Sequence, residues 1–250
     1  MRKKIQTKYH QIEIIDIKGI RYLCSGDKIC RLQSAICLNN LDKNIFDYSL
    51  LAMYSLKFVS NPLNILSIGL GAGVVPRQLS RYKPNSTIDV LEIDSDIVKI
   101  AKDYFLFEDN SNITVHVADA FMAVEFLEKT YDIIILDATM TNYLPFPLIT
   151  KEFFDKIKLI LNKNGVIAAN VCNTHHTFMA EINTLRQVFG DNIYEIQGLV
   201  NNIMSMLYIC DQEPLNNLDL PIKYYPDLHP KKIEITTEVK NTKILSLKNV

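Results

Sequence analysis

The fold is decided by residues 65–73, which read Ile65-Leu66-Ser67-Ile68-Gly69-Leu70-Gly71-Ala72-Gly73. The apolar start is typical of a buried strand, and the glycines form a turn into a predicted helix. Glycines at 69, 71 and 73 let a backbone approach a bound nucleoside closely, although tight strand–helix packing alone can also require them. The next apolar run, 88–93, contains Glu92 about 20 residues later, where a carboxylate can bind a ribose diol. The two runs together predict a nucleoside site.

Composition argues against several classes of protein. The chain has 250 residues and a formal net charge of −1, so no broad basic surface for nucleic acid is expected. It has no apolar segment of the roughly 20 residues that a membrane helix needs. No apolar signal-peptide core follows Arg2-Lys3-Lys4. We therefore expect a cytoplasmic protein with no nucleic-acid or membrane partner.

The five cysteines do not predict a metal site. None of them forms a C-x-x-C pair, and their spacings match no zinc module. Cys172 with His175 and His176 offers an alternative set of metal ligands, but a core thiol beside the start of a helix is the favoured interpretation. We expect reduced thiols and no metal.

The pattern of apolar runs predicts an α/β fold. Helices alternate with nearly all-apolar strands, as in a doubly wound parallel sheet with right-handed crossovers. The predicted strands are 65–68, 88–93, 113–117, 133–136 and 166–170. Two further strand-like runs, 194–199 and 205–209, predict a terminal antiparallel hairpin joined by a turn at Asn201-Asn202. This combination is typical of the Rossmann-like fold of AdoMet-dependent transferases rather than of dehydrogenases.

We divide the chain into three parts. Residues 1–60 form a small β region with strand-like runs at 12–17, 19–24 and 29–38, followed by a linking helix over 45–58. Residues 61–211 form the Rossmann-like nucleoside-binding domain, in which Ser95-Asp96 is expected to cap a helix. Residues 212–250 are rich in Pro, Asn, Asp and Lys, which predicts a loosely packed tail.

Acidic residues follow successive strands of the predicted sheet. Glu92 lies at the end of the second strand, Asp119 follows the third, and Asp137 ends the fourth. In a doubly wound sheet, ligands bind beyond the carboxyl ends of the strands. Glu92 can accept both ribose hydroxyls, and Asp119 beside Ala120 can accept the amino group of adenine. Asp137 would then face the reactive centre.

Several motifs read together resemble the spermidine synthase (polyamine aminopropyltransferase) family over about residues 8 to 210. They are Leu32-Gln33-Ser34-Ala35, the turn 69–73, Val90-Leu91-Glu92-Ile93-Asp94, Ala118-Asp119-Ala120, 131–138 and 148–154. The resemblance implies an amino-terminal β-domain on a Rossmann-like methyltransferase fold, usually in a homodimer. It also implies decarboxylated AdoMet as donor and transfer of its aminopropyl group to putrescine, which leaves methylthioadenosine.

The resemblance also implies roles for individual residues. Glu92 resembles the ribose ligand, Asp119 the adenine ligand, and Asp137 the carboxylate that accepts a proton from the attacking amine. Tyr48 matches a tyrosine that helps to orient that amine, and Gln33 lies near the glutamines of the substrate side. The segment after Asp137, with Asn142, Tyr143 and Pro145, is expected to cover the substrate and to set acceptor choice.

The chain departs from the family's pattern at two acidic positions. Ala72 stands where the family has the aspartate that holds the donor's ammonium, and Met140 stands where it has an aspartate that helps to hold the diamine. Ser49-Leu50 likewise stands in place of a His-Glu pair. Each charged hydrogen bond removed from a closed site costs about 1.5–3 kcal/mol, so weak activity on putrescine is expected. Met140 instead suggests an apolar pocket wall.

Three functions therefore stay open. The first is aminopropyl transfer to an amine with Asp137 as general base. The second is methyl transfer from intact AdoMet, whose amino-acid end would be held by backbone groups of the glycine turn. The third is a non-catalytic nucleoside-binding or dimerisation module.

Overall fold

A computed structural model describes residues 1–26, 30–108, 110–139, 143–198, 203–215 and 230–249. The strands are β1 (Arg2–Gln6), β2 (Gln11–Ile17), β3 (Ile20–Ser25), β4 (Arg31–Cys37), β5 (Asn64–Ile68), β6 (Thr87–Glu92), β7 (Ile113–Val117), β8 (Tyr131–Leu136), β9 (Leu161–Cys172), β10 (Ile193–Gln197), β11 (Met204–Cys210) and β12 (Lys231–Lys232). The α-helices are α1 (Asp47–Met53), α2 (Val74–Tyr82), α3 (Ser95–Phe105), α4 (Ala120–Ala123), α5 (Lys151–Ile160), α6 (Phe178–Phe189) and α7 (Thr237–Asn241). Short 3₁₀ helices occupy η1 (Tyr54–Lys57), η2 (Val124–Phe126), η3 (Phe146–Ile149) and η4 (Leu247–Asn249). Across these ranges, no helix is both long and apolar enough to cross a membrane.

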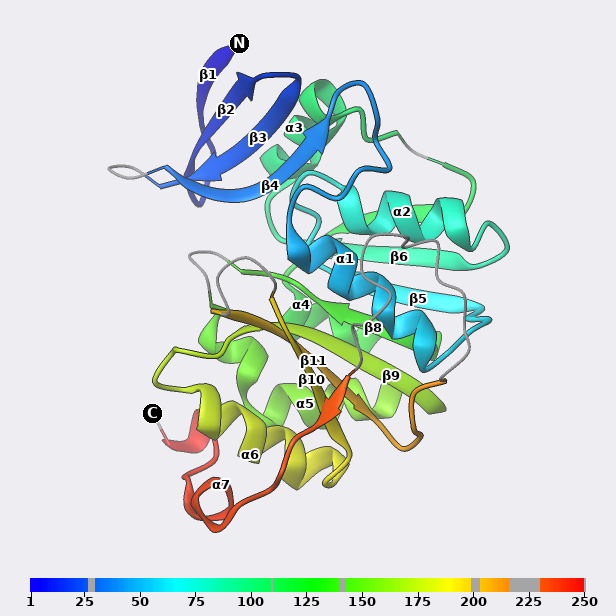
Figure 1. Cartoon of the computed structure of the whole chain (residues 1–250), viewed down its shortest axis with the longest axis vertical. Coiled ribbons are helices and arrows are strands. Elements are labelled where there is room, and N and C mark those ends of the chain that lie inside the picture. The colour runs from blue at the N-terminus through cyan, green and yellow to red at the C-terminus, as the bar shows by residue number, and fades with distance from the viewer. Residues whose placement is uncertain (27–29, 109, 140–142, 199–202, 216–229, 250) are drawn as a thin grey trace.

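The amino-terminal strands form a separate antiparallel sheet in the order β1-β2-β3-β4. Its inner face carries Ile12, Ile14, Leu23 and Ile36, which pack in one cluster with Ala72 of the glycine turn and with residues of α3. In Figure 1 this sheet lies beside α3 at one end of the molecule. The small sheet is therefore fixed against the glycine turn by a shared apolar core.

The large sheet has the order β12-β10-β11-β9-β8-β5-β6-β7. Strands β7, β6, β5, β8 and β9 are parallel, and β11 pairs antiparallel with both β9 and β10. The α/β prediction with a mostly parallel sheet is confirmed. The chain leaves β5 toward β6 on one side and returns to β8 on the other, which makes the β5–β8 pair the topological switch point. The turn predicted at Asn201-Asn202 lies outside the described residues.

Both faces of the large sheet are buried. Alternate residues of each strand point to opposite faces, so Ile65, Ile133 and Ile135 pack beneath α1 and α2. Leu66 and Ile134 pack beneath α5 and α6 on the opposite face. The strands are held between two helical layers, which gives the ends of β5, β6 and β8 a rigid base.

The linking helix is shorter than the periodicity predicts. Instead of a helix over 45–58, the chain forms α1 and then η1. The Ser55 hydroxyl donates a hydrogen bond of 2.7 Å to the carbonyl of Ala52, and the N–H of Tyr54 is shared between the carbonyls of Leu51 and Ala52. Bonds of this kind compete with the regular α-helical ladder, and the tightened last turn follows from them.

The described part of the tail packs more closely than its composition predicts. Val239 of α7 is buried in the core beneath α6, and Asn183 of α6 donates to the carbonyl of Thr242. The backbone N–H of Leu245 donates to Thr184 of α6 at 2.9 Å. Residues 230–249 therefore contact α6 through a few side chains such as Val239, although most of their side chains are exposed.

Candidate active site

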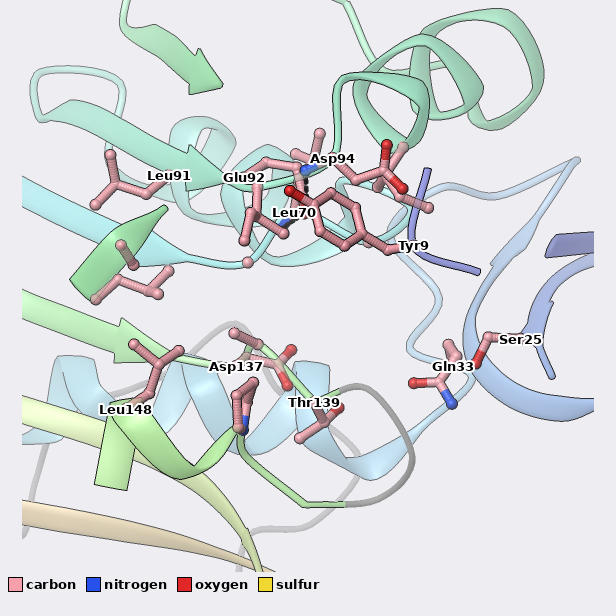
Figure 2. A pocket seen from close by; sticks show the side chains of 18 of the residues that line it. Tyr9, Ser25, Gln33, Leu70, Leu91, Glu92, Asp94, Asp137, Thr139 and Leu148 are labelled. Atoms are coloured by element: carbon pink, nitrogen blue, oxygen red, sulfur yellow. Dashed lines mark hydrogen bonds between the residues drawn. The ribbon is translucent and has the colours of Figure 1, made fainter. Parts of the chain in front are cut away.

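A cavity of about 330 Å³ lies at the carboxyl ends of β5, β6 and β8. Figure 2 shows side chains from the large sheet facing it from two sides, with Tyr9, Ser25 and Gln33 approaching from the amino-terminal sheet. Most of the residues that the sequence singled out line this cavity together: Gln33, Tyr48, Gly69, Gly71, Glu92, Asp119, Ala120 and Asp137. The exception among the predicted ligands is Gly73.

Gly69 and Gly73 are required for different structural reasons. Gly69 has φ +99°, and a Cβ built on it would lie 2.2 Å from the backbone oxygen of Asp137. Only glycine therefore allows the turn to pass this close to the end of β8. A Cβ on Gly73 would instead lie 2.3 Å from the Phe107 ring. Gly73 therefore permits close packing against Phe107 and does not line the cavity, and its contact with the donor stays a prediction.

Glu92 organises the turn as well as facing the cavity. Its two carboxylate oxygens accept backbone N–H groups of Leu70 and Asp94, each at 3.0 Å. The side chain is 8% exposed. Burial raises the pKa of Glu92, and the backbone donors of Asp94 and Leu70 oppose that rise. Each oxygen keeps a further lone pair, so Glu92 can still accept a hydroxyl hydrogen from a ligand.

Asp94 is a cavity carboxylate that the sequence analysis did not single out. It is the N-cap of α3, where its Oδ1 accepts the N–H of Asp96 at 2.9 Å. The predicted cap at Ser95-Asp96 is therefore displaced by one residue. Oδ2 of Asp94 is buried and accepts no hydrogen bond from any described residue. An aspartate directly before an amphipathic helix was the sequence signal for this cap.

Asp119 caps the next short helix. Its Oδ1 accepts the N–H of Phe121 at 2.9 Å, and its side chain is exposed beside buried Ala120. Both residues follow β7 and line the cavity. Glu92 and Asp119 thus stand at the ends of two adjacent strands, because β6 pairs with β7 in parallel.

Asp137 follows β8 and faces the same cavity. Its Oδ1 accepts a hydrogen bond of 2.8 Å from the side-chain amide of Asn170 on β9. Burial raises the pKa of Asp137 to about 7, and the bond from Asn170 opposes that rise. A carboxyl group of this kind exchanges a proton near neutral pH, as a general base must. Asn170 was not predicted as a site residue, although its place at the end of the fifth strand puts it beside Asp137.

Tyr48 and Ser34 join the small sheet to the reactive side of the cavity. Their hydroxyl groups lie 2.5 Å apart. Burial and the negative charge of Asp137 both raise the pKa of Tyr48, and the bond to Ser34 opposes them. Tyr48 therefore stays a neutral hydroxyl near Asp137, in a position to hydrogen-bond a substrate.

The turn between β1 and β2 also reaches the cavity. Tyr9 and His10 line it, and their backbone N–H groups both donate to the hydroxyl of buried Thr7, at 3.2 and 3.0 Å. The analysis of sequence missed these residues. The available signal was Thr7 in a short polar segment between two strand-like runs, a setting typical of a hydroxyl-stabilised turn.

The covering segment after Asp137 is described only in part. Met140 and Asn142 lie outside the described residues. Pro145 lines the cavity, and the ring of Tyr143 stacks on His175 with centroids 4.6 Å apart. The ring of His175 also packs at a tilt against that of His176, and the Cys172 thiol contacts Thr174. Among the described residues, no group of His, Cys, Asp and Glu is arranged to hold a metal ion.

The spermine/spermidine synthase domain matches residues 46–217 of this sequence. The chain belongs to that family. It is 35% identical over 191 residues to the polyamine aminopropyltransferase of Vibrio vulnificus, a match covering 74% of this chain and 64% of that protein. The chain thus spans less than two-thirds of that relative's length.

Solved structures show the same fold. The structure of a probable spermidine synthase from Corynebacterium glutamicum superposes with a TM-score of 0.74 at 21% identity, covering 85% of this chain and 81% of that one. Human methyltransferase-like protein 13, solved in complex with SAH, superposes with a TM-score of 0.60 at 25% identity, covering 70% and 86%. The relatives are therefore transferases of two kinds, aminopropyltransferases and methyltransferases.

Ala72, where this chain departs from the family's pattern, is fully buried. It packs in the apolar cluster beneath the small sheet and does not line the cavity. Its carbonyl accepts a hydrogen bond of 3.2 Å from the guanidinium of Arg77. Ala72 thus contributes a methyl group to the apolar contact between the glycine turn and the small sheet.

The cavity is acidic. Its lining contains Glu92, Asp94, Asp119 and Asp137, and no lysine or arginine among the described residues. His10 is the basic side chain that reaches it. Several carboxylates around one cavity favour a ligand that carries positive charge.

Proposed function

We propose that the protein transfers an aminopropyl group from decarboxylated AdoMet to the nitrogen of a primary amine, with Asp137 as the base. The position of Asp137 carries this proposal. Its buried carboxyl group, with a pKa raised to about 7, faces the same cavity as the glycine turn and Glu92. A protonated amine is no nucleophile, so a base must remove its proton beside the electrophilic carbon.

The chemistry needs few groups. Asp137 takes a proton from the acceptor's ammonium, and the freed lone pair attacks the aminopropyl carbon bonded to the sulfonium. The C–S bond breaks, and its electron pair stays on sulfur, which releases methylthioadenosine. Tyr48 lies close enough to Asp137 for the carboxylate charge to raise its pKa. The Tyr48 hydroxyl then orients the attacking amine.

The nucleoside half of the donor would occupy the other side of the cavity. Glu92 accepts hydrogen bonds from the ribose hydroxyls, and Asp119 and Ala120 contact the adenine. Gly69 and Gly71 bring the backbone close to the donor, and Gln33 approaches from the small sheet. Decarboxylated AdoMet carries two positive charges and no carboxylate, which suits an acidic lining better than intact AdoMet does.

A second function is methyl transfer from intact AdoMet. The structural observation that favours it is the buried position of Ala72, which leaves the donor's ammonium without the family's carboxylate. Backbone groups of the glycine turn would then hold the amino-acid end of AdoMet. The likeness to a human methyltransferase-like protein solved with SAH supports the same alternative.

The two donors give different products, and this difference is the test. The purified protein is incubated with each donor and a panel of primary amines, and the nucleoside products are identified by mass spectrometry against a boiled control. Aminopropyl transfer predicts methylthioadenosine from the decarboxylated donor, and methyl transfer predicts adenosylhomocysteine from AdoMet. Tight nucleoside binding without either product would instead support a non-catalytic module.

We also propose that the protein forms a homodimer, as the family resemblance implies, and that it is cytoplasmic, as its composition suggests. Light scattering of the purified protein measures its oligomeric state, and fractionation of cells that produce it measures its compartment.

A further inference from the structure

Negative charge is distributed unevenly around the cavity. Figure 2 shows Glu92 and Asp94 on one side, and Asp137, Thr139 and Leu148 on the other. Asp119 follows β7, next to the strand that carries Glu92. Within the described lining, the side opposite Glu92 therefore holds a single carboxylate, Asp137.

The rest of that side is neutral. Ala138, Pro145, Pro147 and Leu148 supply apolar surface, and Thr139 supplies a hydroxyl. The whole sequence from 138 to 150 contains no acidic residue. Neutral oxygens can accept a hydrogen bond from an ammonium, but they supply no counter-charge.

A partly buried cation, Arg77, lies near Tyr48. Arg77 donates to the carbonyl groups of Phe105 and Ala72, at 3.0 and 3.2 Å. Its guanidinium forms no ion pair with any described residue. Burial and the charge of Asp137 raise the pKa of Tyr48, whereas the positive charge of Arg77 lowers it. The positive charge of Arg77 therefore partly offsets the effect of Asp137 at Tyr48.

We infer that the acceptor is a primary amine with one positive charge and an uncharged remainder, either apolar or hydroxyl-bearing, rather than a diamine. This inference rests on the proposed function and names its substrate class. Asp137 balances the one ammonium that reacts. A second ammonium would lie against apolar and hydroxyl groups that supply no counter-charge, and an unpaired charge in such surroundings is costly. A hydroxyl at the same distance would meet Thr139 or the Ser34–Tyr48 pair.

The test compares acceptors of equal length. Methylthioadenosine release from decarboxylated AdoMet is measured with butylamine, 4-aminobutan-1-ol and 1,4-diaminobutane. We expect kcat/KM for the better of the first two to exceed that for the diamine by about tenfold or more, the effect of one charged hydrogen bond that is not made. Equal values, or a preference for the diamine, would overturn the inference.

A pair of variants tests the cause of the preference. Thr139→Asp places a carboxylate on the neutral side and should reduce the preference against the diamine about tenfold. Thr139→Asn has nearly the same shape without the charge and should leave the preference as it is. A preference that stays unchanged in Thr139→Asp, or changes equally in both variants, contradicts the electrostatic explanation.

Binding separates this inference from the proposed function. If no amine yields methylthioadenosine, aminopropyl transfer fails as the activity. Calorimetry of the same three amines with the protein saturated in methylthioadenosine then ranks them without turnover. Tighter binding of either singly charged amine supports the inference, and a preference for the diamine, equal binding or no binding of any amine overturns it.

Discussion

Replacing Asn170 with alanine removes the hydrogen bond to the carboxylate that we propose as the base. The amide of Asn170 donates to Oδ1 of Asp137 at 2.8 Å and is the group that opposes the burial-driven rise of the Asp137 pKa. A hydrogen bond to a charged group is worth about 1.5–3 kcal/mol, and about 1.4 kcal/mol corresponds to one pH unit. Because the bond favours the ionised form, its loss raises the pKa. The alkaline shift in the activity midpoint should be about 1 to 2 pH units.

The assay is the pH dependence of kcat/KM for methylthioadenosine formation. The rising limb of the profile should have its midpoint near the Asp137 pKa of about 7 and move to higher pH in Asn170→Ala. Asn162→Ala is the matched control, because Asn162 is also on β9 and its amide donates to Asp132 of β8, away from the cavity. A midpoint that stays in place or falls in Asn170→Ala would refute the assigned role of Asp137, and an equal shift in both variants would refute the local cause.

Three further predictions follow from single contacts. Gly69→Ala should lower the free energy of unfolding by about 2–5 kcal/mol, because the position has a positive φ and the new Cβ would lie 2.2 Å from the Asp137 carbonyl oxygen. Gly190 also has a positive φ, but a Cβ there would have nothing within 4 Å. Gly190→Ala should therefore lower the free energy of unfolding less than Gly69→Ala in the same denaturant titration. Glu92→Gln should weaken methylthioadenosine binding about 10- to 100-fold, because the amide N–H₂ of the glutamine would then face the backbone N–H of Leu70 or Asp94. Calorimetry measures this affinity, and an unchanged affinity would exclude Glu92 as a ribose ligand. Asp119→Asn should weaken binding of methylthioadenosine more than binding of a ligand that lacks the adenine amino group, and equal losses for both ligands would contradict its assigned contact.

The positions of the strands, and their burial on both faces, could be predicted from the sequence because both depend on local runs of residues. Runs such as 65–68 and 133–136 are apolar on both faces, which only a sheet covered on both sides requires. The placement of Glu92, Asp119 and Asp137 at one edge follows from the parallel alternation of strands and helices. The pairing of β11 between β9 and β10 could not be read from the residues, since strand order depends on contacts between distant segments.

Parts of the site depend on such distant contacts as well. Asn170 reaches Asp137 because β8 and β9 are neighbours in the sheet, and Tyr9 reaches the cavity because the small sheet packs on α3. The packing need at Gly73 could not be predicted either, because it depends on the position of the distant Phe107 ring. The same limit applies to Ala72, whose burial in an apolar cluster depends on the fold of residues 12–36.

The central claim is that Asp137 removes the proton from an amine that attacks the donor's aminopropyl carbon. Its most direct test is the single-turnover rate of methylthioadenosine formation in the wild-type protein and in Asp137→Asn, with decarboxylated AdoMet already bound and methylthioadenosine affinity measured in parallel. We predict that the rate falls about 10²- to 10⁴-fold, the contribution of a general base, while the affinity for methylthioadenosine changes little. An equal rate in the two proteins, or no methylthioadenosine from the wild type with any amine, would contradict the claim.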